Sequence, residues 1–104
     1  MLINPEQNKT SWGKEVIFIN KELPARTPIE AGIFECEPGA SLELHVHENG
    51  DEYCYLFAGQ GVFVIAGQEY KVETGQAIKI PRGIKHLSYN NGDQTFRSFF
   101  IVCP

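Results

Sequence analysis

The stretch GASLELHVHENGDEYCYLFAG, residues 39–59, decides the fold. Apolar and polar side chains alternate on both sides of its Asn49-Gly50 pair, with the period of two that is typical of β-strands. An Asn-Gly pair favours a type I′ hairpin, whose two-residue loop fixes the register of the strands that it joins. The sequence therefore predicts strands at 41–47 and 52–57, paired with each other.

This register brings side chains that can bind a metal to one face of the sheet. His47 would lie opposite Glu52, and His45 opposite Cys54, and side chains two residues apart point the same way. Two imidazoles and a carboxylate on an otherwise apolar face would form three ligands of a metal site. A histidine in a strand can instead be a hydrogen-bonded structural residue, but burying this cluster without an ion would be costly.

The rest of the chain is also predicted to be β-structure. Ten glycines separate short stretches rich in Val, Ile, Phe and Tyr, and no window has the periodicity of a helix. Further strands are predicted at 32–37, 62–65, 70–72, 77–80, 86–89 and 95–102. Evenly spaced short strands are typical of an all-β sandwich or jelly-roll barrel. Residues 1–30 are predicted to form an N-terminal arm with one strand at 16–20, and residues 31–104 the barrel.

Three more turns extend the register. Gly59-Gln60 and Gly67-Gln68 suit type II′ turns. Asn91-Gly92 suits a type I′ turn, which would pair His86 with Arg97. The inner face would then also carry Leu56, Phe63, Ile65, Tyr70 and Val72.

The opposite face of these strands is too apolar to be left in water. It would carry eight apolar residues: Leu42, Leu44, Val46, Tyr53, Tyr55, Phe57, Val62 and Val64. Either the N-terminal arm or a second subunit is expected to cover them. The sequence therefore predicts a homodimer. In one interpretation the N-terminal arm, residues 1–30, contributes to dimerisation.

The composition excludes several classes of function. The chain has 104 residues, enough for one domain, and its 42% hydrophobic and 21% charged residues are ordinary for a soluble protein. A net charge of −4 without a basic cluster argues against a nucleic-acid partner, and the apolar runs are too short to cross a membrane. Three cysteines without a Cys-x-x-Cys spacing are expected to be free thiols. Since the first residues do not resemble a signal peptide, a cytoplasmic location is expected.

Two motifs in the chain resemble those of the cupins. Residues 39–59 match the first cupin motif, G-x5-H-x-H-x4-E-x6-G, and residues 75–90 match the second, G-x5-P-x-G-x2-H-x3-N, at every position. The short segment between them, 60–74, is similar to that of the small single-domain microbial form. The resemblance implies a double-stranded β-helix, which is a jelly-roll barrel, and one metal with four ligands: His45, His47, Glu52 and His86.

This implied ligand set restricts the metal. Three imidazoles and one carboxylate suit a divalent transition metal: Fe(II), Mn(II), Ni(II) or Co(II), with Zn(II) at a lower coordination number. They disfavour Ca(II) and Mg(II), which prefer oxygen ligands. An octahedral ion would keep two positions open, unlike a closed structural site. Since binding needs neutral imidazoles, metal affinity is expected to fall below about pH 6.

Three residues near the ligands each have two interpretations. Glu43, two residues before His45, is either a general base or a solvent-exposed residue at the barrel rim. Cys54 is either a small core residue or a reactive thiol. Arg97 either points into the pocket, where it would suit an anionic substrate such as a carboxylate, or forms a surface salt bridge.

Two classes of function fit these features. The first is a metalloenzyme whose small oxygenated substrate chelates the open metal positions, and the resemblance allows a dioxygenase, isomerase or epimerase, lyase, or decarboxylase. An isomerase or lyase needs a placed acid or base, of which few are available, whereas a dioxygenase needs mainly the metal and an electron-rich substrate. Dioxygenase chemistry is therefore favoured. The second class is a non-catalytic module that binds a metal or a metabolite.

Overall fold

The computed structural model describes residues 2, 4–19 and 30–104, except the side chains of residues 18 and 19. These residues form nine strands: β1 (Glu6–Lys9), β2 (Gly13–Ile19), β3 (Glu30–Cys36), β4 (Asp51–Ala58), β5 (Gln60–Ile65), β6 (Gln68–Glu73), β7 (Ala77–Ile80), β8 (His86–Tyr89) and β9 (Phe96–Cys103). No helix that could cross a membrane is found among the described residues.

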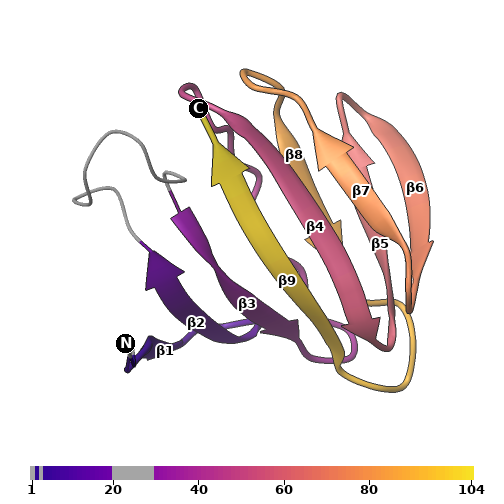
Figure 1. Ribbon diagram of the computed structural model, residues 1–104. Coiled ribbons are helices and arrows are strands. Elements are labelled where there is room, and N and C mark those ends of the chain that lie inside the picture. The colour runs from indigo at the N-terminus through magenta and orange to yellow at the C-terminus, as the bar shows by residue number, and fades with distance from the viewer. Residues whose placement is uncertain (1, 3, 20–29) are drawn as a thin grey trace.

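The strands form two antiparallel sheets arranged as a jelly roll (Figure 1). The large sheet has the order β1-β2-β3-β9-β4-β7, and the small sheet has the order β6-β5-β8. In Figure 1 the small sheet lies behind the end of the large sheet that β4 and β7 form. Neighbours such as β3 and β9 are distant in the chain, so long-range pairing builds both sheets. The predicted all-β jelly roll is confirmed.

The hydrophobic core lies between the two sheets. Every second side chain of β9 is buried, as the strand period of two requires. The core cluster comprises Phe34, Cys36, Cys54, Leu56, Phe63, Val72, Ile80, Phe96, Phe100 and Val102. The rings of Phe34 and Phe96 in the large sheet lie 6.5 and 6.2 Å from the ring of Phe63 in the small sheet, measured between centroids. Aromatic contacts therefore join the two layers.

The predicted hairpin at Asn49-Gly50 is wrong. β4 pairs with β9 along one edge and with β7 along the other, which leaves no edge for residues 41–47. That segment instead lies beside β8 of the small sheet, where His45 forms an isolated bridge with His86. Asn49-Gly50 is therefore a crossing from one sheet to the other, and the predicted cross-strand pairs do not form.

Two other predicted turns are also crossings between sheets. Gly59-Gln60 connects β4 to β5, and Asn91-Gly92 lies between β8 and β9, and in both cases the two strands belong to different sheets. The predicted pairing of His86 with Arg97 is therefore wrong. In β9, Arg97 pairs with Glu35 of β3. A glycine turn can reverse a strand within a sheet or move the chain to the facing sheet, and local sequence does not distinguish the two.

The hairpin predicted near Gly67 does form, with its loop shifted by one residue. Ile65 pairs with Gln68, so the loop is Ala66-Gly67 rather than Gly67-Gln68. Both loop residues have positive φ, 51° and 81°, as a type I′ turn requires. The sequence did not predict this loop because an alanine rarely adopts the left-handed conformation.

The N-terminal arm extends the large sheet at its edge. β2 pairs with β3, and β1 with β2, so the arm has two strands where the sequence predicted one at 16–20. Because β1 and β2 continue the sheet in its own plane, they do not cover its outer face.

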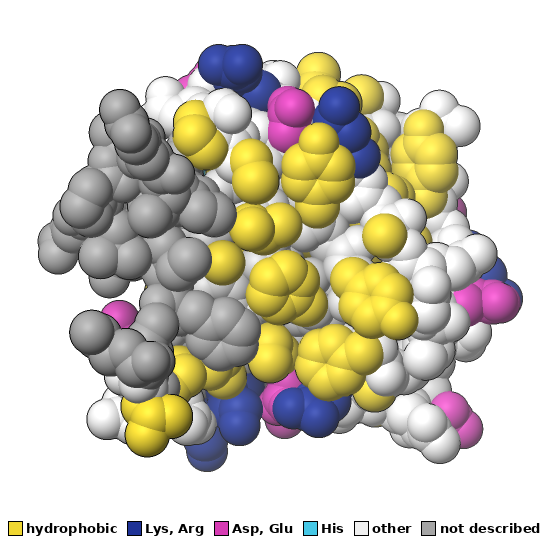
Figure 2. Space-filling view, viewed as in Figure 1, with side chains coloured by type: hydrophobic (Ala, Val, Ile, Leu, Met, Phe, Trp, Pro, Cys, Tyr) yellow, Lys and Arg dark blue, Asp and Glu magenta, His cyan; other side chains and the backbone are white. Residues whose placement is uncertain are grey.

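The outer face of the large sheet carries part of the predicted apolar surface. Tyr53 and Tyr55 of β4 are 41% and 46% exposed, and Figure 2 shows hydrophobic side chains gathered over β4 and β9. The eight residues predicted for one face do not all lie there. Val62 belongs to the small sheet and is buried, and Leu42 packs against the core. The predicted face is divided because its strands belong to two sheets.

Candidate metal centre

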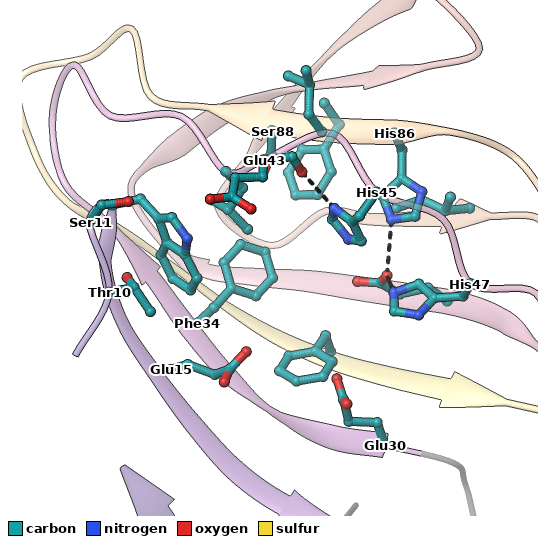
Figure 3. A pocket seen from close by; sticks show the side chains of 17 residues that line it. Thr10, Ser11, Glu15, Glu30, Phe34, Glu43, His45, His47, His86 and Ser88 are labelled. Carbon is teal, nitrogen blue, oxygen red and sulfur yellow. Dashed lines mark hydrogen bonds and ion pairs between the residues drawn. The ribbon is translucent and has the colours of Figure 1, made fainter. Parts of the chain in front are cut away.

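The four predicted ligands lie together. His45, His47, Glu52 and His86 each offer a donor atom, and these atoms all lie within 4.8 Å of one another. Glu52 belongs to β4 of the large sheet, His86 begins β8 of the small sheet, and the other two lie in the segment between β3 and β4. Figure 3 shows the three imidazoles grouped at one end of a pocket. The cluster therefore forms although the hairpin that predicted it does not.

Backbone contacts position the three histidines. The amides of His45 and His86 donate to each other's carbonyl oxygens, both at 2.9 Å, and the ring centroids lie 4.1 Å apart. The amide of Gly83 donates to the carbonyl oxygen of His47 at 2.9 Å. Gly83 has a φ of 77°, which glycine adopts without steric cost. The turn before β8 therefore holds the segment that carries His47.

Carbonyl oxygens fix the tautomers of two imidazoles. Nδ1 of His45 lies 2.7 Å from the carbonyl oxygen of Glu43, and Nδ1 of His86 lies 2.9 Å from that of Ile84. A carbonyl oxygen only accepts, so Nδ1 of each ring carries the proton and donates. The other ring nitrogen, Nε2, then presents a lone pair, as in metal-ligating histidines.

Glu52 contributes a buried carboxylate that the protein alone does not satisfy. Its Oε1 lies 2.8 Å from Nε2 of His47 and 3.3 Å from Nε2 of His86. Both Oε1 and Nε2 of His86 are buried without a hydrogen bond of good geometry. Two lone pairs that face each other in a buried place are costly unless a cation lies between them. The donors therefore fit a divalent transition metal.

The protonation states also suit a cation. Burial opposes ionisation of Glu52, but the nearby rings of His47 and His86 and the thiol of Cys54 outweigh burial and hold the pKa of its carboxyl below the usual range. Burial lowers the pKa of His45, against a backbone hydrogen bond that raises it, and the neighbouring imidazoles lower it further. At neutral pH the cluster offers a carboxylate and a neutral imidazole, which are the forms that bind a metal.

A pocket of about 420 Å³ lies beside the cluster. One wall is aromatic and is formed by Trp12, Phe34, Phe63 and Phe100. Besides Glu52, the lining includes three carboxylates: Glu15, Glu30 and Glu43. No lysine or arginine occurs among the described residues that line the pocket. Small molecules bind in pockets of this size that combine an apolar wall with a few polar groups.

The structure separates the alternatives for Cys54 and Arg97. Cys54 is 1% exposed and belongs to the core, and burial raises the pKa of its thiol well above the usual value, so the core alternative holds. Arg97 lies on the outer face, where its Nε donates to Oε1 of Glu35 at 2.6 Å. Arg97 therefore forms the surface salt bridge. The argument for an anionic substrate depended on a guanidinium in the pocket and no longer has this support. Glu43 is exposed and lines the pocket, which fits both of its interpretations.

The pocket residues of the N-terminal arm were not predicted. Thr10, Ser11, Trp12 and Glu15 all line the pocket. Glu15 reaches it because β2 pairs with β3, which places Glu15 directly beside Phe34. The β-forming run at 16–19 is a signal for the strand itself. No signal in the sequence indicates an inward carboxylate, because a charged residue in a strand is usually exposed.

Comparison with known proteins identifies the relatives of this chain. A family model described as a cupin domain matches residues 32–102. The tetracenomycin polyketide synthase protein TcmJ of Streptomyces glaucescens is 34% identical over 73 residues, which cover 70% of this chain and 49% of TcmJ. The oxalate-binding protein of Thermotoga maritima is 29% identical over 65 residues, which cover 62% of this chain and 54% of that protein. The chain spans about half the length of the curated relatives it matches.

Solved structures share the fold. A predicted oxalate decarboxylase from Thermotoga maritima superposes with a TM-score of 0.79 at 23% identity, covering 97% of this chain and 92% of that one. The capsular polysaccharide assembling protein CapF of Staphylococcus aureus gives a TM-score of 0.81 at 22% identity, covering 99% of this chain and 30% of CapF. At these identities the likeness shows the fold alone.

Proposed function

The chain belongs to the cupin family, and from this premise we propose that it is a metal-dependent enzyme acting on a small oxygen-bearing substrate. One observation carries the proposal. Two buried atoms without hydrogen bonds, Oε1 of Glu52 and Nε2 of His86, lie 3.3 Å apart, and both residues line an open pocket. A cation between them would satisfy both atoms and be accessible to a ligand in the pocket.

The proposed ligands are His45, His47, Glu52 and His86, and the proposed ion is Fe(II), Mn(II), Ni(II), Co(II) or Zn(II). When bound, the ion would polarise substrate oxygens at its open positions and, if it is iron, supply redox chemistry with O₂. The carbonyl oxygens that fix the tautomers of His45 and His86 keep both rings ready to bind. The aromatic side chains of the lining would disfavour water beside a bound substrate.

Dioxygenase chemistry is the proposed reaction, and Glu43 is the proposed general base. Glu43 is exposed at the pocket, and its backbone carbonyl oxygen accepts the hydrogen bond of His45. An isomerase would need a second acid or base on the far side of the substrate, for which Glu15 and Glu30 are the lining candidates. Relatives include a polyketide synthase protein and an oxalate decarboxylase, so action on an oxygen-rich small molecule has support.

Metal analysis followed by an oxygen assay tests the proposal. Protein purified without added metal is analysed for its elements, then loaded with Fe(II) and assayed for O₂ uptake with diketones, flavonols and thiols. We expect uptake that the His47→Ala variant loses and the neighbouring Glu48→Gln variant keeps. Proton exchange without O₂ uptake would favour an isomerase. Binding of a metal or a small molecule without turnover would favour the non-catalytic module. Protein that takes up no metal would overturn the proposal.

We also propose that two copies of the chain associate through the outer face of the large sheet. The register places Ile33, Phe99 and Tyr55 in one row across β3, β9 and β4, with Ile101 and Tyr53 in the next row (Figure 2). An exposed apolar surface of this kind is typical of an interface. Light scattering after gel filtration should give the mass of a dimer, and Tyr55→Glu should give a folded monomer. A monomeric parent protein would contradict the proposal.

A further inference from the structure

The charges around the pocket point to the kind of ligand that it takes. Its described lining includes Glu15, Glu30, Glu43 and Glu52 but no lysine or arginine. Glu15 belongs to β2, Glu30 begins β3 and Glu43 precedes β4, so separate elements contribute them. In Figure 3, Glu43 lies on one side of the Phe34 ring, and Glu15 and Glu30 lie on the other. A ligand beside Phe34 would therefore have carboxylates on two sides.

These carboxylates outweigh a bound divalent ion. Formal charges of +2 for the ion and −1 each for Glu52, Glu15 and Glu43 leave the pocket at −1, even without counting Glu30. An anionic ligand would add negative charge to a partly enclosed site, where solvent screens repulsion less than on an open surface. Arg97, the cation that the sequence analysis offered for this pocket, lies on the outer face with Glu35.

The apolar wall suits a flat ring. Trp12 stands edge-on to Phe34, with ring centroids 6.3 Å apart and an interplanar angle of 89°. Phe100 lies 5.9 Å from Phe34 on the same measure. Aromatic faces and edges bind other rings by offset or edge-to-face packing. A cavity of about 420 Å³ also has room for a ring, whereas a two-carbon acid would leave most of the cavity unfilled.

Resting on the proposed function, we propose that the ligand is an uncharged aromatic molecule with two adjacent oxygen donors, and that carboxylate anions are poor ligands. Carbonyl and ether oxygens would bind the ion without losing a proton, so such a ligand stays uncharged, and its ring lies against the wall of Trp12, Phe34 and Phe100. The acidic lining acts as the specificity determinant because it repels anions and leaves a neutral chelator unaffected. Specificity arises here from an unfavourable charge as well as from contacts.

The pair 2-methoxybenzamide and 2-methoxybenzoate tests this inference, because both carry two adjacent oxygens on one ring, neither needs to lose a proton to bind a metal, and only the second is an anion. Both are titrated calorimetrically into Ni(II)-loaded protein and into the Glu15→Gln/Glu43→Gln double variant. Comparing each ligand between the two proteins cancels its intrinsic affinity for Ni(II). Removing two negative charges should tighten 2-methoxybenzoate binding about fivefold and change 2-methoxybenzamide binding less than about twofold. The exposed Glu73, which does not line this pocket, gives the control Glu73→Gln, expected to change neither.

Each remaining outcome is decisive. Binding of 2-methoxybenzoate that is unchanged in the double variant would overturn the role of the acidic lining. Binding of both ligands that tightens equally in the double variant would overturn the ligand class while leaving the metal site intact. Protein that binds no Ni(II) would overturn the proposed function, and this inference with it.

Discussion

The thiol of Cys54 donates a hydrogen bond to Oε2 of Glu52, with 3.1 Å between Sγ and Oε2. Both side chains are buried on the inner face of β4, two residues apart. The bond engages one carboxylate oxygen and leaves Oε1 facing His47 and His86. Cys54 therefore fixes the rotation of the carboxylate, so that a single oxygen points at the metal centre.

We expect Cys54→Ala to weaken Ni(II) binding about tenfold, because loss of a hydrogen bond that orients a ligand typically has this effect. Cys54→Ser keeps a donor at the same place and should retain most of the affinity. Calorimetric titration of Ni(II) into the metal-free proteins measures both. Equal losses in the two variants would mean that packing, rather than the hydrogen bond, is what matters.

Cys36 offers the matched control. It is as fully buried as Cys54, but its thiol donates to the backbone carbonyl oxygens of Glu37 and Ala40 and not to a carboxylate of the metal centre. Cys36→Ala should lower the stability of the fold through the cavity that it leaves and leave Ni(II) affinity unchanged.

His47→Ala should abolish the stabilisation that a metal confers. A ligand that binds only the folded state adds about 2.7 kcal/mol at one hundred times its dissociation constant, which corresponds to roughly 10 °C in Tm for a domain of this size. We expect Ni(II) to raise the Tm of the parent protein by about this amount. Thermal melts with and without Ni(II) measure the effect, with Glu48→Gln as the neighbouring control. A Tm shift of the same size in His47→Ala would exclude this imidazole as a ligand.

Acid should weaken the metal centre. Because the pKa of His45 is lowered, this imidazole stays neutral to a lower pH than a free histidine, whose pKa is about 6.5. We expect the dissociation constant for Ni(II), measured calorimetrically, to be constant above about pH 7 and to rise below about pH 6, where protons compete for the imidazoles. Affinity that persists unchanged at pH 5 would contradict binding by histidines.

The stability of the metal-free protein should also decrease as the pH falls. The unfolded chain takes up a proton at His45 before the folded chain does, so the free energy of unfolding decreases as pH falls through about 6.5. It decreases again below about pH 4.3, where Glu52 of the unfolded chain is protonated first. Urea unfolding across this range measures both steps.

The site was more predictable than the pairing of the strands. Their separation by two residues puts His45 and His47 on the same side of an extended segment, and the alternation of β4 puts Glu52 on its buried face, whatever strand lies beside them. The motif resemblance supplied His86. Pairing depends on which distant segment occupies each edge of a strand. The sequence around Asn49-Gly50 carries no information about β9, which pairs with β4 from the far end of the chain.

The arm shows a second limit. Trp12 and Glu15 line the pocket because β2 forms backbone hydrogen bonds with the edge of β3. Backbone donors and acceptors are the same in every residue except proline, so side-chain patterns indicate that a strand forms but not where it docks. The acidic lining on which the proposed ligand class rests could therefore be seen only in the structure.

Arg97→Ala should leave the site unaffected. The guanidinium lies 4.9 Å from the centre of the Phe57 ring and pairs with Glu35 on the outer face. A half-exposed ion pair contributes less than about 1 kcal/mol, so only a small loss of stability is expected in urea unfolding. The affinities for Ni(II) and for 2-methoxybenzamide should equal those of the parent protein. A tenfold loss of either affinity would mean that Arg97 reaches the pocket in solution.

Gly50→Ala should be costly because the chain crosses between the sheets at this residue. Gly50 is buried, and a Cβ there would lie 2.2 Å from the carbonyl oxygen of Cys103 at the end of β9. The crossing or the end of β9 would have to move, at a cost of about 1–3 kcal/mol in unfolding free energy. Gly92→Ala is the control, since its nearest contact is the Asn90 side chain at 3.3 Å, and should cost less. The crossing joins the segment of His45 and His47 to the strand of Glu52, so Gly50→Ala should also weaken Ni(II) binding. If the Gly50→Ala and Gly92→Ala variants had equal stability and equal Ni(II) affinity, the close packing at Gly50 would be contradicted.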